Sequence, residues 1–157
     1  MAIPVGSAAP EFTLTGTDGG QIRFARGANE HTFLVFWKSS CPYCQEYVPQ
    51  LGAVFQRHSE APVRVLGVAV GADTAESAAR FQQSANFPFP TGVDEQREVR
   101  QAYQLFRVPT IVLVDPTGEV LRTYIGGRGE MVTAIDDALT SIEKGIAVAG
   151  YDLEGSG

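Results

Sequence analysis

The stretch FWKSSCPYCQEYVPQL, Phe36–Leu51, contains both cysteines of this 157-residue chain. Cys41 and Cys44 are separated by only two residues. Two cysteines at this spacing can supply half of a zinc site, close a short structural loop or exchange disulfides with another molecule. The surrounding residues distinguish these three uses.

The pair lies at a predicted strand-to-helix junction. The run TFLVFW, residues 32–37, has no polar face and is typical of a central strand buried on both sides. Apolar residues then recur at three- and four-residue steps, which predicts a helix over residues 42–58. Pro42 suits the first helical position, whereas Pro49 falls inside the helix and is expected to kink it.

Strands and helices alternate along the rest of the chain. This order predicts an α/β fold with a mixed central sheet flanked by helices on both faces, an N-terminal β-hairpin and a central αβ insertion. We interpret residues 1–157 as a single domain with a frayed tail from about residue 146. The expected elements are a hairpin over residues 11–24, strands at 63–70, 110–115 and 119–125, helices at 74–87, 95–106 and 129–145, and an extended connection at 87–94.

Composition narrows the function classes. Charged residues make up 19% of the chain and the net charge is −6, which disfavours nucleic acid and anionic membranes as partners. No apolar run approaches the ~20 residues that span a bilayer. The N-terminus lacks the pattern of a signal peptide, which predicts a cytoplasmic protein. The alternative is a periplasmic or extracytoplasmic protein whose export signal or anchor is not in this sequence.

Disulfide exchange explains the position of the pair better than metal binding or stapling. The two histidines lack a ligand spacing: His31 falls in a predicted polar turn and His58 at a predicted helix C-terminus. A loop this short removes little entropy from the unfolded chain, so a structural disulfide would stabilise little. By contrast, a helix N-terminus favours a thiolate at Cys41. Cys44, one turn further, can then resolve a mixed disulfide by attacking the sulfur of Cys41.

The segment resembles the active site of the thioredoxin superfamily. Trp37 matches the tryptophan that covers that site, and Pro49 matches its helix-kinking proline. The sequence RVPT, residues 107–110, resembles the loop that carries a cis proline opposite the disulfide. The resemblance implies that Pro109 is cis and that Val108 pairs with a substrate strand. The predicted substrate-binding and site-shaping residues are Trp37, Pro42, Tyr43, Val108, Pro109 and Thr110.

Residues 5–139 resemble the redoxin branch, which includes TlpA/ResA-like oxidoreductases and peroxiredoxins. Peroxiredoxins carry Thr or Ser, and further upstream Pro, where this chain has Lys38 and Leu34. That difference disfavours a peroxidase, which we keep as an alternative function. The dipeptide between the cysteines matches that of glutaredoxins and implies a potential less reducing than that of thioredoxin.

No residue is assigned as the proton acceptor for Cys44. Thioredoxins place a buried Asp where this chain has Val35, and TlpA/ResA-like proteins often place an acid near the site. Glu46 and Asp73 are the candidates for such an acid. Lys38, three residues before Cys41, is a possible modulator of the pair through its positive charge, and Glu46 is a second one as a candidate acid.

The predicted function is a TlpA/ResA-like thiol-disulfide oxidoreductase in which Cys41 attacks and Cys44 resolves. Its expected partners are protein thiols or disulfides and an upstream electron donor, and we expect a monomer. The redox-active disulfide replaces any dissociable cofactor, and no metal is expected. A metal-binding chaperone that uses the two thiols is the alternative from another class.

Overall fold

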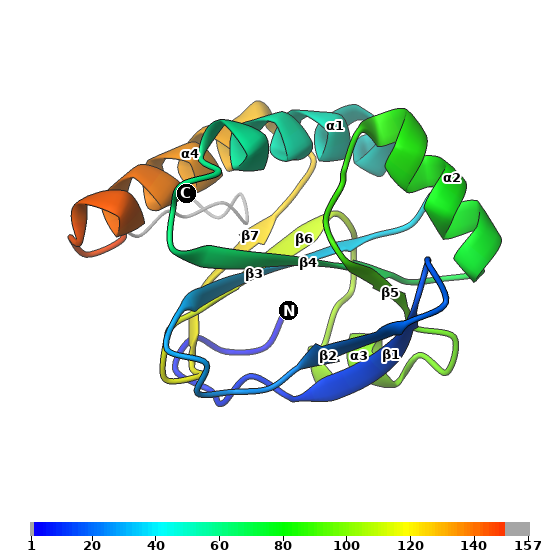
Figure 1. Cartoon of the computed structure of the whole chain (residues 1–157), viewed down its shortest axis with the longest axis horizontal. Helices are drawn as coiled ribbons and strands as arrows, with labels where there is room; N and C mark the ends of the chain where they lie inside the picture. Colours follow the sequence, from blue (N-terminus) through cyan, green and yellow to red (C-terminus); the bar gives the residue numbers. More distant parts are fainter. Residues whose placement is uncertain (1, 150–157) are drawn as a thin grey trace.

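A mixed seven-stranded sheet lies at the centre of the computed structural model, which describes residues 2–149 (Figure 1). The strand order is β2-β1-β5-β4-β3-β6-β7. Within the described residues the strands are β1 (Phe12–Gly16), β2 (Gln21–Phe24), β3 (His31–Trp37), β4 (Val63–Ala69), β5 (Thr91–Val93), β6 (Thr110–Val114) and β7 (Val120–Ile125), and the helices are α1 (Pro42–Arg57), α2 (Ala75–Ala85), α3 (Glu98–Ala102) and α4 (Gly129–Lys144).

The interior strand β3 contributes side chains to both layers of the core. It pairs in parallel with β4 and antiparallel with β6. Successive side chains of a strand point to opposite faces. Phe33 and Val35 accordingly pack with residues of α1, α2 and α4, whereas Leu34 and Phe36 pack with residues of α3 and the N-terminal segment. Figure 1 shows the three long helices together on one side of the sheet. The predicted fold class is confirmed, although within residues 2–149 the second face is covered by a single short helix, α3.

The predicted extended connection at residues 87–94 contains a strand, β5. It pairs in parallel with β4 and antiparallel with β1. Gly67 of β4 allows this close pairing, since a Cβ there would lie only 2.3 Å from Oγ1 of Thr91. Three residues are too few for a periodic pattern, so the strand is visible only through its partners.

The helix predicted over residues 95–106 is wrong in length, because α3 covers only Glu98–Ala102. Arg97 adopts the left-handed conformation at φ 61°, which prevents an earlier helix start. The carboxylate of Asp94 then accepts hydrogen bonds from the N–H groups of Val99 and Arg100. This capping fixes the first turn of α3.

One smaller expectation also changes. His31 is the first residue of β3 rather than part of a turn. In the predicted frayed tail, Val148 is buried and Arg122 donates hydrogen bonds to the carbonyls of Val148 and Ala149, whereas Ile146 is exposed. The rest of that tail, residues 150–157, lies outside the described residues.

His58 links the end of α1 to α4. Its Nε2 lies 2.6 Å from Oδ1 of Asp136, and its Nδ1 lies 2.9 Å from Oε1 of Glu143. Burial opposes protonation of the ring, but the two carboxylates outweigh it and the pKa of His58 is raised. His58 is therefore favoured in its charged form on the folded chain.

The His58 contacts are expected to stabilise the fold mainly in acid. A group whose pKa rises on folding contributes fully below its unfolded-state pKa, about 6.5, and loses that contribution as pH rises through the folded-state pKa. We expect His58→Gln to lower stability by about 1 kcal/mol near pH 5.5, because the carboxylates are partly exposed. The loss should shrink as the pH rises through the folded-state pKa, which lies above that of a free histidine.

Thermal unfolding of the native protein and of His58→Gln, repeated at several pH values from about 5.5 upward, measures the difference in stability between them. Subtracting the two curves removes the contribution of His31, whose pKa is lowered by burial against the opposing charge of Asp115. A difference that stays constant with pH would show that the charge of His58 does not stabilise the fold.

Candidate active site

Cys41 and Cys44 occupy different environments at the start of α1. Cys41 is the N-cap residue, and its N–H donates to the carbonyl of Lys38. It is 8% exposed, whereas Cys44, inside the first turn, is fully buried. Both are free thiols. The sulfur that can meet another molecule is therefore that of Cys41.

The buried thiol is held in its protonated form. Burial raises the pKa of Cys44 strongly, and the neighbouring Cys41 raises it further. A hydrogen bond with the main chain of Lys38, together with the positive charge of that residue, acts in the opposite direction. Lys38 thus influences the second cysteine of the pair.

A loop from the far end of the sequence faces the first sulfur. The Val108–Pro109 peptide bond is cis, as the sequence predicts. The thiol of Cys41 donates to the carbonyl of Val108, with a sulfur–oxygen distance of 3.6 Å. Thr110 donates through its hydroxyl to the carbonyl of Arg107, which closes the loop where β6 begins. The Cys41–Val108 contact brings together residues 67 positions apart.

The next strand supports this loop from behind. Gly126 follows β7, and its N–H donates to the carbonyl of Pro109 at 2.8 Å. A Cβ at Gly126 would lie 2.5 Å from Cγ of Pro109 and 3.1 Å from the sulfur of Met131. Only glycine fits between the proline loop and α4.

The other predicted residues lie at different depths. Trp37 is fully buried and stacks on Phe81 with ring centroids 4.6 Å apart, so it packs in the core beneath the pair. Its Nε1 has no hydrogen-bond partner among residues 2–149. Pro42 and Tyr43 are exposed at the start of α1. Glu46 is exposed one turn further along.

Asp73 does not contact the sulfurs but holds the loop in front of them. Its buried carboxylate accepts hydrogen bonds from the N–H and hydroxyl of Ser39, two residues before Cys41. It also accepts from the hydroxyl of Ser77 in the first turn of α2. Gln45 completes the loop by donating to the carbonyl of Ser39. Sequence spacing gave no signal for a contact across 34 positions.

Replacing Asp73 with asparagine is expected to destabilise the fold by about 2 kcal/mol, because an amide cannot accept all three hydrogen bonds. For a chain of this size the Tm should fall by roughly 4–8 °C. Disulfide reduction should also slow, since the loop before Cys41 loses its anchor. Thermal unfolding and a reduction assay measure the two effects. The exposed Glu60→Gln is the control, and equal behaviour of the two variants would refute this role.

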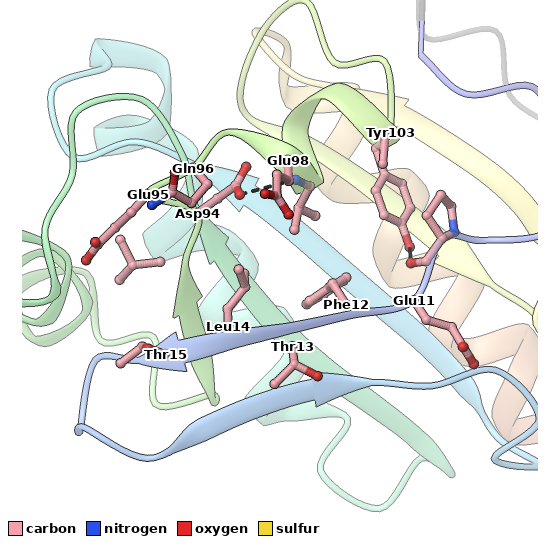
Figure 2. A pocket seen from close by; sticks show the side chains of 14 residues that line it. Glu11, Phe12, Thr13, Leu14, Thr15, Asp94, Glu95, Gln96, Glu98 and Tyr103 are labelled. Carbon is pink, nitrogen blue, oxygen red and sulfur yellow. Dashed lines mark hydrogen bonds between the residues drawn. The ribbon is translucent and has the colours of Figure 1, made fainter.

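A hollow of about 470 Å³ lies away from the cysteines, between β1 and α3 (Figure 2). Phe12 and Leu14 line it, and the carboxylates of Glu11, Glu95 and Glu98 lie around it. Its buried polar groups are already paired: Asp94 caps α3, and the hydroxyl of Tyr103 donates to the carbonyl of Pro10. This hollow contributes no group to the cysteine site.

The position of the cysteine pair and the loop that faces it place this chain in the thioredoxin-fold class. A putative thiol:disulfide interchange protein DsbE from Chlorobium tepidum has a similar structure, with a TM-score of 0.76 and 25% identity over 85% of this chain and 94% of that one. A model of the AhpC/TSA family matches residues 5–123.

Two relatives narrow the class further. The thiol-disulfide oxidoreductase ResA of Geobacillus kaustophilus is 32% identical over 80% of this chain and 71% of the relative. ResA of Bacillus subtilis is 29% identical over 92% of this chain and 79% of the relative. The chain therefore belongs to the AhpC/TSA family, among its ResA-like thiol-disulfide oxidoreductases. The predicted family and its oxidoreductase activity are confirmed.

The comparisons do not favour the two alternative functions. The named relatives are oxidoreductases that exchange thiols and disulfides. Residues 2–149 contain no group of three or more His, Cys, Asp or Glu side chains placed to hold a metal ion. No helix in the same part of the chain is long and apolar enough to cross a membrane.

Proposed function

We propose that Cys41 and Cys44 form the redox pair of this oxidoreductase, with Cys41 as the attacking residue. The difference in burial between the two sulfurs carries this assignment. Cys41 is the N-cap residue of α1 and keeps 8% of its surface exposed, so a partner sulfur can reach it. Cys44 is enclosed and its pKa is raised by burial, so it stays a thiol until the first step is complete.

The proposed reaction has two exchanges. The thiolate of Cys41 attacks a disulfide of the partner, forms a mixed disulfide and releases one partner thiolate. Cys44 then gives up its proton and attacks the sulfur of Cys41, which forms the Cys41–Cys44 disulfide and releases the second partner thiolate. Two electrons pass to the partner. Run in reverse, the same steps oxidise a partner dithiol.

The loop at Val108–Thr110 is the proposed binding site for the partner chain. Val108 already places its carbonyl 3.6 Å from the reactive sulfur. Pro109 has no N–H group, so an approaching main chain meets no competing donor at that point. An extended partner segment could therefore lie along this loop with its cysteine beside Cys41.

We propose protein disulfides as substrates and a further thiol protein as electron donor. Since the electrons are carried in a sulfur–sulfur bond, the exchange needs no dissociable cofactor. The monomeric state and the cytoplasmic or extracytoplasmic location stay predictions. Trp37 is proposed to support the pair from the core, and Lys38 to favour ionisation of Cys44.

Trapping tests the order of attack. In Cys44→Ser the first exchange can occur but the resolving thiol is absent, so mixed disulfides with a model protein disulfide should accumulate. They should appear as a reducible band shift of one partner per chain. Cys41→Ser should form no such species, because the remaining thiol is buried. If Cys41→Ser traps partners and Cys44→Ser does not, the roles are reversed.

A further inference from the structure

The surface beside Cys41 differs in charge from the rest of the chain. A groove of about 240 Å³ lies there, lined by Tyr43 of α1, Arg107 and Val108 of the proline loop, and Gly127 and Arg128 after β7. We call it the arginine groove. No carboxylate of the described part of the chain lines it, although the full sequence carries 18 acidic and 12 basic side chains. A cationic surface therefore adjoins the proposed reactive sulfur on an acidic protein.

The groove and the sulfur share a residue. Val108 lines the groove and accepts the hydrogen bond of the Cys41 thiol. Whatever occupies the groove thus lies within one or two residues of a cysteine joined to Cys41. On a partner in extended form, neighbouring residues are spaced about 3.3 Å apart, which matches this reach.

Neither guanidinium group of the groove is paired with a carboxylate of the described residues. Arg107 and Arg128 are exposed and form no ion pair within residues 2–149. Helix α4 begins directly after Arg128, so its unpaired N–H groups add positive potential at the same place. An arginine presents a planar fork of donors that fits a carboxylate.

Two acidic side chains lie near the groove without lining it. Burial, followed by the charges of Glu46 and Glu130, raises the pKa of Tyr47, one α1 turn beyond Tyr43. Glu46 belongs to α1 and Glu130 to the first turn of α4, and neither carboxylate is among the groove-lining groups.

Exposed aromatic rings accompany the charges. Tyr43 is 56% exposed and Phe106 is 49% exposed, and Arg107 lies over the Phe106 ring at 5.2 Å from its centroid. Exposed aromatic and arginine side chains are typical of surfaces that bind other proteins. Their position beside the proline loop suits a peptide segment better than a small ion.

We propose that the arginine groove receives an acidic side chain of a protein substrate, within two residues of the substrate cysteine that joins Cys41. This inference rests on the proposed function of the pair. The occupant is an extended protein segment whose carboxylate binds Arg107 and Arg128. Because the chain as a whole is acidic, such a segment is repelled elsewhere on the protein and is directed to this surface.

Three oxidised peptides test the proposal. Each is a disulfide-linked dimer with a single cysteine, flanked on both sides by Glu, by Gln or by Lys. Reduced protein is mixed with each peptide at low ionic strength, and the second-order rate of peptide reduction is measured. A free thiolate reacts more slowly with the Glu peptide because of charge repulsion. 2-Mercaptoethanol provides that reference.

We expect the protein to reverse this order and to reduce the Glu peptide about fivefold faster than the Gln peptide, the effect of one partly exposed ion pair. Reduction of the Lys peptide should be the slowest. The ratio of the Glu-peptide rate to the Gln-peptide rate should approach the ratio measured with 2-mercaptoethanol at about 0.5 M salt, where the Debye length is only a few ångströms.

The arginines are tested together in Arg107→Gln/Arg128→Gln. We expect its Glu-to-Gln ratio to fall to the 2-mercaptoethanol value at low salt. Arg23→Gln is the matched control, since Arg23 is exposed on β2 at the opposite edge of the sheet, and it should keep the native ratio.

A native ratio equal to that of 2-mercaptoethanol overturns the proposal, as does a preference that the double variant retains. The proposal is also overturned if the protein reduces oxidised glutathione faster than the Gln peptide but shows no preference for the Glu peptide. The groove would then bind a small thiol rather than a protein segment. If the protein reduces none of the disulfides, the proposed redox pair itself fails. The salt series uses the native protein alone, so the proposal stays testable even if the double variant does not fold.

Discussion

Cys41→Ser is expected to reduce the rate of disulfide reduction by at least about 1,000-fold, because a serine hydroxyl is not a nucleophile towards sulfur at neutral pH. The remaining thiol, that of Cys44, is buried and its pKa is raised by burial, so it cannot replace the lost group. Reduction of insulin with dithiothreitol as electron source measures the loss.

Ser40→Ala is the matched control for this variant. Ser40 precedes Cys41 and is exposed, so the substitution changes the same loop without touching either sulfur. It should keep the native rate. Full activity in Cys41→Ser would refute the proposed attack, whatever the behaviour of the control.

Gly126→Ala is expected to have the second-largest effect, on both stability and activity. The new Cβ would lie 2.5 Å from Cγ of Pro109 and 2.8 Å from its carbonyl oxygen. The proline loop must shift to relieve this contact, at a cost of about 2 kcal/mol. Since Val108 in that loop contacts the Cys41 sulfur, the rate of disulfide reduction should fall about tenfold, the effect of about 1.4 kcal/mol.

The chain contains a nearby control in Gly129. It is the first residue of α4, and a Cβ there meets no atom within 4 Å. Gly129→Ala should change the free energy of unfolding by less than about 0.5 kcal/mol. Thermal unfolding and the insulin assay, run on Gly126→Ala and Gly129→Ala, measure the stability and the activity of each variant. Equal stability of the two variants would show that the proline loop tolerates the extra methyl group.

Much of the fold was predictable because its signals are local. The run at residues 32–37 has no polar face, which is typical of a strand covered on both faces, and it forms an interior strand of the sheet. The Thr74–Ser77 capping box at the start of α2 and Gly145 at the end of α4 are local signals of this kind. The short elements β5 and α3 were missed or misjudged, because their limits depend on partners such as Gly67 and on the carboxylate of Asp94.

The two cysteines and the proline opposite them could also be found in the sequence, since spacing and residue type identify them. The sequence could not give the acid that matters for the loop before them. Asp73 appeared as a candidate near the sulfurs, but it binds Ser39 and Ser77 instead. Its function depends on how β4 and α2 are placed against β3, which no local pattern encodes.

Periodicity, helix signals and cysteine spacing are properties of neighbouring residues, so the thioredoxin-type fold and the pair of thiols could be predicted from them. Which of the two sulfurs is accessible is a property of the folded chain alone, since burial depends on everything packed around Cys44. Folding also brings Tyr43, Arg107 and Arg128 to one groove from three separate segments. Charges far apart in the chain act together only when folding places them within a few ångströms of each other.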